Sequence, residues 1–118
     1  MTVDEVGGYA SIQRWLEAHG SHWSRTAADA DRLRRLEVMR RYCEFADRDP
    51  DALVGNLFRQ TPTGTRIWLK RRRVEMARID EFEAMVAAGD TRAGRETANV
   101  VRSFFIHNGV ALSATPLR

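Results

Sequence analysis

Residues 61–76, TPTGTRIWLKRRRVEM, open the stretch around which this sequence is organised. Thr61-Pro62 is a helix-start signal, because a hydroxyl side chain can cap the backbone and proline fits the first turn. Apolar residues then recur at helical spacing as far as Val86, and Gly89 is a natural stop. The pattern predicts one long helix over residues 61–88.

The charges of this predicted helix run against its dipole. Five of the eight residues from 66 to 73 are basic, and the acidic residues come later. The N-terminal end of a helix is its positive end and favours acids over bases. Cations gathered there indicate an anionic partner, with nucleic acid as the first candidate. A solvated basic face that keeps the domain soluble accounts for the same residues, and this stretch alone supports both interpretations equally.

The composition is that of a single folded domain. Of the 118 residues 43% are hydrophobic and 30% charged, which is too apolar for wholesale disorder. The formal charge is +3, and residues 91–118 carry four arginines against one glutamate. Lys70 is the only lysine among 19 basic residues, and the other 18 are arginines. The guanidinium group of arginine forms paired hydrogen bonds to phosphates and base edges better than the lysine ammonium does.

Signals for secretion and membrane insertion are absent from the sequence. The N-terminus is acidic, without the pattern of a signal peptide, and no apolar run approaches the length of a membrane span. We therefore expect a cytoplasmic protein. The single cysteine, Cys43, excludes an internal disulfide, and its apolar neighbours on a helix predict an inert core thiol.

Helical patterns fill the rest of the chain, so we predict an all-α fold without a sheet. No stretch alternates with period two. The fold comprises four principal helices plus a short one, with antiparallel neighbours joined by brief loops. Beside the helix over 61–88, the predicted helices cover 9–19, 24–47, 51–58 (started by Asp49-Pro50) and 92–108 (capped by Thr91). Residues 1–8 are expected to be a mobile lead-in.

Apolar residues indicate which helix faces form the core. On the helix over 24–47 they are Leu36, Met39, Tyr42, Cys43 and Ala46. Charges on its other side alternate in sign, so pairing within the helix accounts for them. On the helix over 61–88 the apolar face comprises Ile67, Trp68, Val74, Ile79, Phe82, Met85 and Val86. Trp68 lies close to the cations, as a platform for a base would, but its apolar face favours a core tryptophan.

The last predicted helix carries a row of polar residues. Arg92, Arg95, Asn99 and Arg102 recur at spacings of three, four and three, which places them on one stripe. Only Glu96 offsets these charges nearby, so pairing within the helix explains the stripe poorly. A stripe of this kind can lie along a groove, with arginines on phosphates or guanines and asparagine on adenine.

No residues form a catalytic or metal-binding constellation. His19, His22 and His107 have no carboxylate or cysteine partner at metal spacing and no nucleophile to activate. No glycine-rich loop precedes a helix. We expect this chain to have no enzyme activity, cofactor, metal or small-molecule substrate.

Two groups of residues form a familiar pattern. The first group is Ser24-Arg25-Thr26, then Leu36, Tyr42 and Phe45 along a helix, then DPDALV at 49–54. The second group is TANVVRSFFIHNGV at 97–110, then Thr115-Pro116-Leu117. Over residues 12–117 these patterns resemble the N-terminal core-binding domain of tyrosine recombinases, the phage-integrase family with a SAM-like fold. The motifs are loose hydrophobic patterns rather than invariant signatures.

The resemblance implies a SAM-like orthogonal bundle of helical hairpins over 24–109. A segment over 1–23 precedes it, either packing on the domain or contacting a neighbouring protomer in a recombinase tetramer. A linker over 110–118 leads toward a catalytic domain. In the family the core-binding domain grips one face of duplex DNA, and the tyrosine nucleophile belongs to the catalytic domain. Tyr9 and Tyr42 fall in the core pattern, so neither inherits that role. We expect a non-catalytic, DNA-binding chain that is either part of a longer recombinase, which we favour, or a stand-alone relative.

The expected DNA contacts combine the basic residues with this resemblance. They are Ser24, Arg25, Thr26, Arg66, Lys70, Arg71, Arg73, Arg92, Arg95, Asn99 and Arg102. The stripe on the last helix is where DNA is expected first. The alternative is a helical protein-interaction module whose basic surface meets an acidic partner. A small helix-turn-helix regulator is a weaker third hypothesis.

Overall fold

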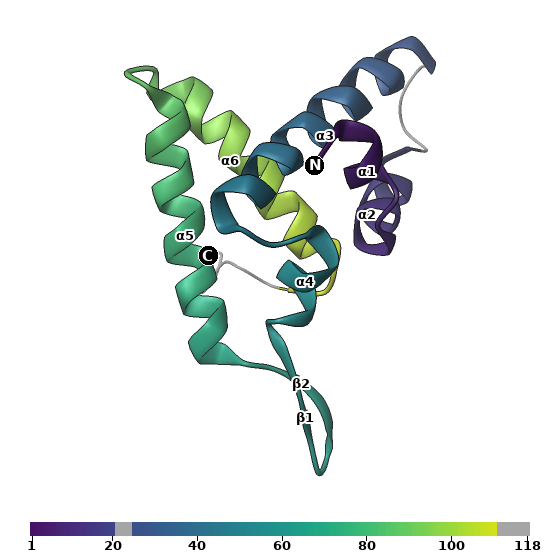
Figure 1. Ribbon diagram of the computed structural model, residues 1–118, viewed down its shortest axis with the longest axis vertical. Helices are drawn as coiled ribbons and strands as arrows, with labels where there is room; N and C mark the ends of the chain where they lie inside the picture. Colours follow the sequence, from purple (N-terminus) through teal and green to yellow (C-terminus); the bar gives the residue numbers. More distant parts are fainter. Residues whose placement is uncertain (21–24, 111–118) are drawn as a thin grey trace, which may run out of the picture.

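The structure is mostly helical, as predicted, with one small two-stranded sheet (Figure 1). The computed structural model describes residues 1–20 and 25–110, and among them the side chains of all but 19–20 and 25–29. In chain order the elements are α1 (Val3–Gly7), α2 (Ala10–Gly20), α3 (Arg25–Ala46), α4 (Pro50–Gly55), β1 (Phe58–Thr61), β2 (Gly64–Ile67), α5 (Leu69–Ala87) and α6 (Thr91–Ile106).

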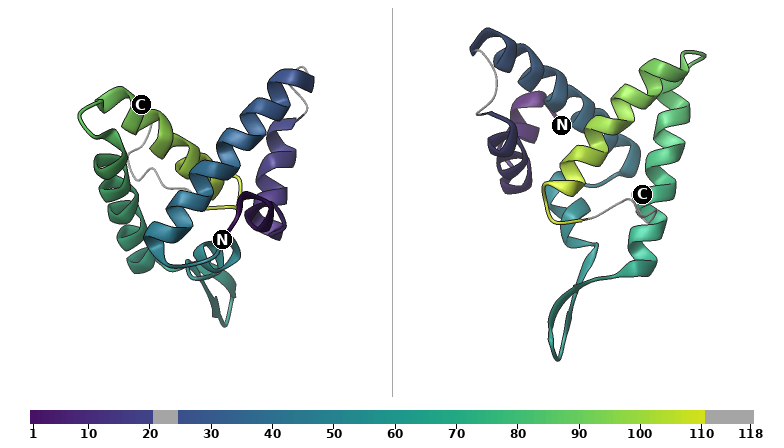
Figure 2. Two further views of the ribbon diagram at one scale, coloured as in Figure 1. Left: turned by 45° about the horizontal axis from the view of Figure 1, so that its top comes forward. Right: turned by 180° about the vertical axis from the view of Figure 1, so that it is seen from behind.

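Two helical arms diverge from a shared core and give the molecule the shape of a V (Figures 1 and 2). One arm is α3, with α1 and α2 against it. The other arm is the antiparallel hairpin of α5 and α6, and α6 also contacts α3. At the closed end of the V lie α4 and the β-hairpin, which projects away from the helices (Figure 1). Within the described residues, no helix has both the length and the apolar character required to cross a membrane.

Aromatic side chains fill the core where the arms meet. The ring of Tyr42 lies 5.1 Å from that of Phe82 at 84°, and Phe104 lies 5.2 Å from Phe105. Trp15 of α2 reaches Phe104 at 5.6 Å. All five side chains are fully buried, and most of these ring pairs adopt the edge-to-face geometry that aromatic quadrupoles favour. The predicted core position of Tyr42 is confirmed.

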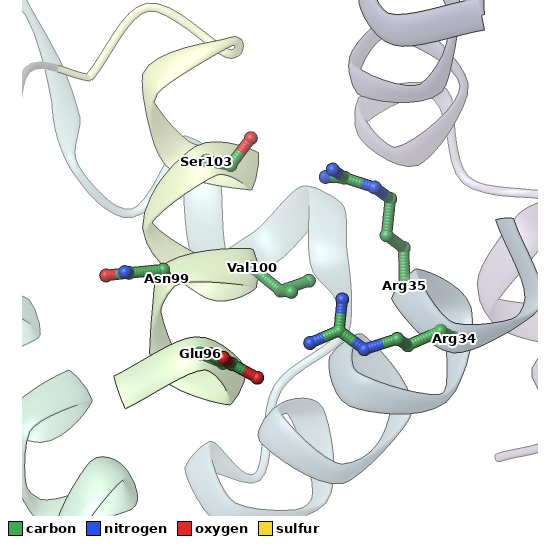
Figure 3. A pocket seen from close by; sticks show the side chains of 6 residues that line it. All are labelled: Arg34, Arg35, Glu96, Asn99, Val100 and Ser103. Atoms are coloured by element: carbon green, nitrogen blue, oxygen red, sulfur yellow. The ribbon is translucent and has the colours of Figure 1, made fainter. Parts of the chain in front are cut away.

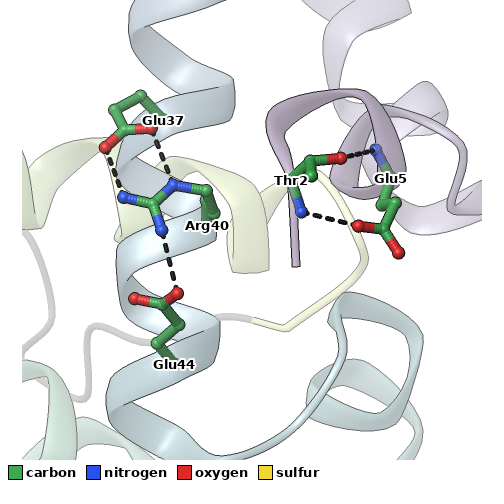
Figure 4. A network of polar contacts seen from close by, with 5 residues as sticks. All are labelled: Thr2, Glu5, Glu37, Arg40 and Glu44. Carbon is green, nitrogen blue, oxygen red and sulfur yellow. Dashed lines mark hydrogen bonds and ion pairs between the residues drawn. The ribbon is translucent and has the colours of Figure 1, made fainter.

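The first residues form a helix rather than the expected lead-in. The Thr2 hydroxyl accepts from the Glu5 backbone N–H at 3.1 Å, and the Glu5 carboxylate accepts from the Thr2 N–H at 2.8 Å (Figure 4). This reciprocal capping box starts α1, and it places Val6 in the core with no exposed surface. The prediction of a mobile segment over 1–8 is wrong, because the Thr-x-x-Glu signal was overlooked.

The prediction that the charged side of α3 pairs within the helix holds only in part: Glu37 and Glu44 are paired, but the predicted arginines 34, 41 and 48 form no ion pair among the described residues. Arg40 binds Glu37 at 2.7 Å and Glu44 at 2.9 Å, one turn to either side (Figure 4). Arg35 binds Asp31 at 2.5 Å. Spacings of three and four residues bring these side chains together on the helix surface.

The sequence prediction of a helix from Thr61 is wrong, because a β-hairpin occupies this place. β1 and β2 pair antiparallel, with Thr61 opposite Gly64 and Pro62-Thr63 between them. Gly64 has a φ of 121°, a backbone conformation that residues other than glycine rarely adopt. The β-branched residues that alternate through 61–67 favour extended backbone. Proline here starts a turn rather than a helix, and the expectation of no sheet is overturned.

Both helices beside the hairpin are shorter than predicted. α4 ends at Gly55, and α5 begins only at Leu69. The backbone N–H of Trp68 donates to the carbonyl oxygen of Leu57 at 2.7 Å, which closes the base of the hairpin.

Aspartates cap two of the helices. Asp49 accepts from the Ala52 N–H at 2.8 Å, which confirms the predicted start of α4. For α6 the capping side chain is Asp90, which accepts from the Ala93 N–H at 3.1 Å. Thr91 is therefore the first helical residue and not the cap, one position from the prediction.

The apolar face of α5 is narrower than predicted. Its buried residues are Glu75, Ile79 and Phe82, whereas Val74 is 55% and Met85 53% exposed. Assigning Val74 and Met85 to the core was wrong. Among the described elements, α6 and α3 provide most of the contacts with this helix, so a single stripe of it is buried.

α6 packs closely against α5 at Gly94. A Cβ atom on this residue would lie 2.6 Å from the Cβ of Ala87 and 2.8 Å from the carbonyl oxygen of Glu83. Contacts of that length are too short for any side chain, so glycine permits this crossing.

Replacing Gly94 should therefore separate the helices of this arm. We expect Gly94→Ala to lower the free energy of unfolding by roughly 1–3 kcal/mol, measured by urea denaturation followed by circular dichroism. Gly55→Ala is the control, because a Cβ at Gly55 meets nothing within 4 Å. Similar losses in both variants would contradict a steric cause.

Candidate nucleic-acid interface

No carboxylate occurs between Asp51 and Glu75, a stretch that carries six cations. The structure folds this stretch into the end of α4, the β-hairpin and the first turn of α5. We call its cations the basic junction; they are Arg59, Arg66, Lys70, Arg71, Arg72 and Arg73. Arg71 and Arg72 are half-buried, and the other four are exposed. Positive charge is therefore concentrated where the hairpin joins α5.

The hairpin places two of these arginines side by side. Arg59 on β1 is the register partner of Arg66 on β2. Directly opposed residues point to the same face of an antiparallel pair, with Cβ atoms roughly 5 Å apart, and like charges there are destabilising. Arg59 was not among the predicted contacts. The absence of acidic residues near it in the sequence is the feature from which it could have been predicted.

The start of α5 breaks a second rule of local stability. Trp68 occupies the N-cap position and makes no side-chain capping hydrogen bond. No acidic residue lies in the first turn, and four consecutive cations, residues 70–73, begin there. Uncapped N–H groups and the positive end of the dipole favour an anion at this place. Two unfavourable charge arrangements thus coincide at one end of the molecule, as expected of a functional surface.

Trp68 lies among the arginines instead of in the core. The guanidinium carbon of Arg71 lies 3.8 Å from the centroid of the indole, and that of Arg59 lies 5.4 Å from it. Arg71 also donates to the side-chain oxygen of Asn56 at 2.8 Å and to its backbone oxygen at 3.2 Å. The tryptophan is half-buried, so its assignment to the core is corrected. Arg71 joins hairpin, α4 and α5, and its donors are partly used within the protein.

The stripe on α6 is partly consumed by ion pairs. Arg102 donates to Asp80 at 3.1 Å, to Glu83 at 2.7 Å and to Asn99 at 2.9 Å. Two of these acceptors are on α5, so Arg102 braces the α5–α6 hairpin. The expectation that internal pairing explains the stripe poorly is wrong for this residue. The carboxylates lie 19 and 22 residues away in sequence, which spacing on one helix cannot reveal.

The start of α6 keeps more of its positive charge available. Arg92 is exposed and pairs with Glu96 at 3.2 Å. Arg95 is exposed, and its side chain has no hydrogen-bond or ion-pair partner among residues 1–20 and 25–110.

The structure does not bring the predicted contacts to one place. α5 separates the basic junction from the start of α6, and its 19 residues span about 28 Å. The two groups lie toward opposite ends of the α5–α6 hairpin (Figure 2). Of the other predicted contacts, Ser24 lies outside the described residues, as do the side chains of Arg25 and Thr26.

A polar cleft of about 430 Å³ lies between α3 and α6 (Figure 3). Arg34 and Arg35 extend into it from α3, facing Glu96 and Ser103. Arg35 also lies over the Trp15 ring at 5.4 Å, and the Trp15 indole N–H donates to Ser103 at 3.1 Å. Much of this polar lining therefore serves to hold α2, α3 and α6 together.

A buried polar cluster links α3 to α5. The Tyr42 hydroxyl donates to Oε2 of Glu75, and Arg78 donates to Oε1 at 2.8 Å. Glu75 is only 2% exposed. Burial, and next the Glu75 charge, raise the pKa of Tyr42, so the hydroxyl stays protonated. Sequence analysis missed this cluster, although Glu75 lies four and seven residues before Ile79 and Phe82 on the buried face.

The described residues include neither a reactive thiol nor a grouped metal site. Burial raises the pKa of the Cys43 thiol to about 12, so its reactive thiolate is suppressed. Within the described part of the chain, no three His, Cys, Asp or Glu side chains are grouped to hold a metal ion. What the basic junction can do is attract and bind anions.

Comparison with known proteins gives no relative. No family model, curated protein or solved structure matches this chain.

Tyr42→Phe tests the buried cluster. The variant leaves one Glu75 oxygen without its donor in the core, so we expect the free energy of unfolding to fall by about 1–3 kcal/mol. Tyr9→Phe is the control, because the half-buried Tyr9 hydroxyl has no hydrogen-bond partner among the described residues. Unchanged stability of Tyr42→Phe in chemical denaturation would show that Glu75 does not need this bond.

Cys43 should be inert in the folded protein. A pKa raised to about 12 keeps the thiol protonated at pH 8, so Ellman's reagent should react only after denaturant unfolds the chain. The sign of the shift also predicts that this group's stabilising contribution is complete below pH 9 and falls as the pH approaches 12. Rapid labelling at pH 8 without denaturant would contradict this assignment.

Proposed function

We propose that the chain binds duplex DNA through the basic junction, as the non-catalytic DNA-binding domain of a site-specific recombinase. The observation that carries the proposal is the stretch without carboxylates between Asp51 and Glu75, which exposes four cations on a projecting hairpin and an uncapped helix start. Charge of one sign gathered on one surface attracts the phosphate backbone from a distance and supplies most of the non-specific affinity for DNA.

The hairpin suggests how the surface meets DNA. A two-stranded ribbon fits the major groove of B-DNA, and this hairpin projects clear of the helices (Figure 1). Arg59 and Arg66, on one face, are placed to contact phosphates or guanine edges, while Lys70 and Arg73 lie at its base. In this arrangement Arg71 holds the hairpin against α5. It contributes positive charge to the surface, but its guanidinium group already contacts Asn56 and Trp68.

The proposed contact set differs from the one expected from sequence. Arg59 is added to the set. Arg102 becomes a minor contact, because Asp80 and Glu83 occupy the donors of Arg102. Arg92 and Arg95 remain as a second, smaller contact at the far end of α5. A duplex lying along this arm would touch both groups.

The recombinase part of the proposal rests on the motif resemblance. Of the residues that carry it, Asp49-Pro50 starts α4 and the Phe104-Phe105 pair is buried in the core. Catalysis would belong to another domain, because Tyr42 is buried against Glu75 and Cys43 is held protonated. Such a protein acts on DNA in the cytoplasm, and protomer contacts in a tetramer are part of the same proposal.

Removing the exposed cations tests the function. We expect the triple variant Arg66→Ala, Lys70→Ala and Arg73→Ala to lose most of its affinity for duplex DNA in fluorescence anisotropy. The native slope of log K against log salt should correspond to roughly 4–6 phosphates, and the variant slope should fall by about 3.

The matched control removes the same charge elsewhere. Arg32→Ala, Arg34→Ala and Arg41→Ala take three exposed arginines from α3, so both variants change the net charge equally. Equal losses of DNA affinity in the two variants would show that only the net charge matters and would contradict the proposal. No binding of the native chain at low salt would favour the alternative, a module for an acidic protein partner.

A further inference from the structure

A second basic feature lies beside the junction, between the turn after α3 and the first turns of α5. It is a cavity of about 220 Å³ that opens to solvent. Its lining is Arg48, Asn56, Arg71, Val74, Glu75 and Arg78, which we call the arginine pocket. Arg71, Val74, Glu75 and Arg78 recur at three, one and three residues, so they share one face of α5, while Arg48 comes from the turn after α3.

The three guanidinium groups are held to different degrees. Arg71 is positioned by Asn56 and by the Trp68 ring. Arg78 is positioned by its 2.8 Å bond to Glu75. The side chain of Arg48 is exposed and has no hydrogen-bond or ion-pair partner in the described parts of the chain. Two arms of the pocket are thus preorganised, and the third is free to close on a ligand.

The pocket carries an uncompensated positive charge. Glu75 is its only carboxylate, and both oxygens of that carboxylate are taken, one by Tyr42 and one by Arg78. The charge of Glu75 balances Arg78, which leaves Arg48 and Arg71 without an ion pair among the described residues, since the acceptors on Asn56 are neutral. Gathering guanidinium groups costs electrostatic free energy that an oxyanion between them would relieve.

We infer that the arginine pocket binds one phosphate group. Guanidinium forks match the oxygens of phosphate in pairs, and a tetrahedral oxyanion can accept from three directions at once. Resting on the proposed function, the phosphate belongs to the DNA backbone where the duplex passes the base of the hairpin. Free inorganic phosphate has the same chemistry and is the probe for the pocket itself.

Binding of inorganic phosphate is measured first. The nitrogen-15-labelled chain is titrated with sodium phosphate in place of chloride at constant ionic strength and pH. We expect saturable shifts at the backbone amides of Arg48 and Asn56 and at the side-chain N–H of Arg71. Arg41, exposed on α3 and outside the pocket, should not move. Shifts of similar size at Arg41, or none at the pocket, would overturn the inference.

The variant for this measurement is Arg48→Gln, with Arg41→Gln as its control. Arg48 is exposed and unpaired, so the variant should fold with an unchanged melting temperature. Losing one charged donor should weaken phosphate binding roughly tenfold or more, whereas the control should bind as the native chain does. Equal affinity of Arg48→Gln and native protein would remove Arg48, and with it the pocket, from consideration.

The same variants identify the source of the phosphate. If it belongs to DNA, Arg48→Gln lowers the salt slope of duplex binding by about 1 and Arg41→Gln leaves it unchanged. Phosphate binding by a chain that binds no duplex would support the pocket, assign it to free phosphate and defeat the proposed function. Duplex binding without pocket shifts would defeat the pocket and leave the proposed function intact.

Discussion

The buried carboxylate of Glu75 is the constraint on which the arrangement of the two arms depends. A charge that is 2% exposed must be paired, and Tyr42 on α3 and Arg78 on α5 satisfy its two oxygens. The Tyr42 bond ties α3 to the face of α5 that also buries Phe82, whereas Arg78 pairs with Glu75 within α5. Breaking the pairing would leave an uncompensated charge between the arms, where aromatic rings otherwise exclude water.

Positive charge gathers at the closed end of the V because the cations precede Glu75 in the sequence and fall in the hairpin and the first turns of α5. Two features at this end lower the stability of the fold. Arg59 and Arg66 oppose each other across the hairpin, and α5 starts with cations and without a capping side chain. The aromatic core and the Gly94 crossing are well packed in comparison, so the rest of the fold can tolerate this end. The projecting hairpin and the pocket of three arginines do not stabilise the isolated fold, but their charge is complementary to a polyanion.

The α6 stripe shows how far helix periodicity can be trusted. It correctly grouped Arg92, Arg95, Asn99 and Arg102 on the polar side of an amphipathic helix. It could not show that Arg102 meets Asp80 and Glu83, because those carboxylates come from the antiparallel neighbour. Similarly, Thr61-Pro62 is compatible with a helix start and with a turn. Pairing of β1 with β2, a contact between segments, decided for the turn.

The sequence by itself determined the helical class, the Asp49-Pro50 start, the inward positions of Tyr42 and Cys43, and the concentration of cations before Glu75. These follow from spacing, capping and composition, which act within a few residues. Tertiary structure alone decided that Glu75 is buried, that Arg102 joins α6 to α5, and that Arg48 and Arg71 line one pocket. Each of these depends on which side chains from distant segments meet, and pairing of buried or opposed charges is settled only when the helices pack.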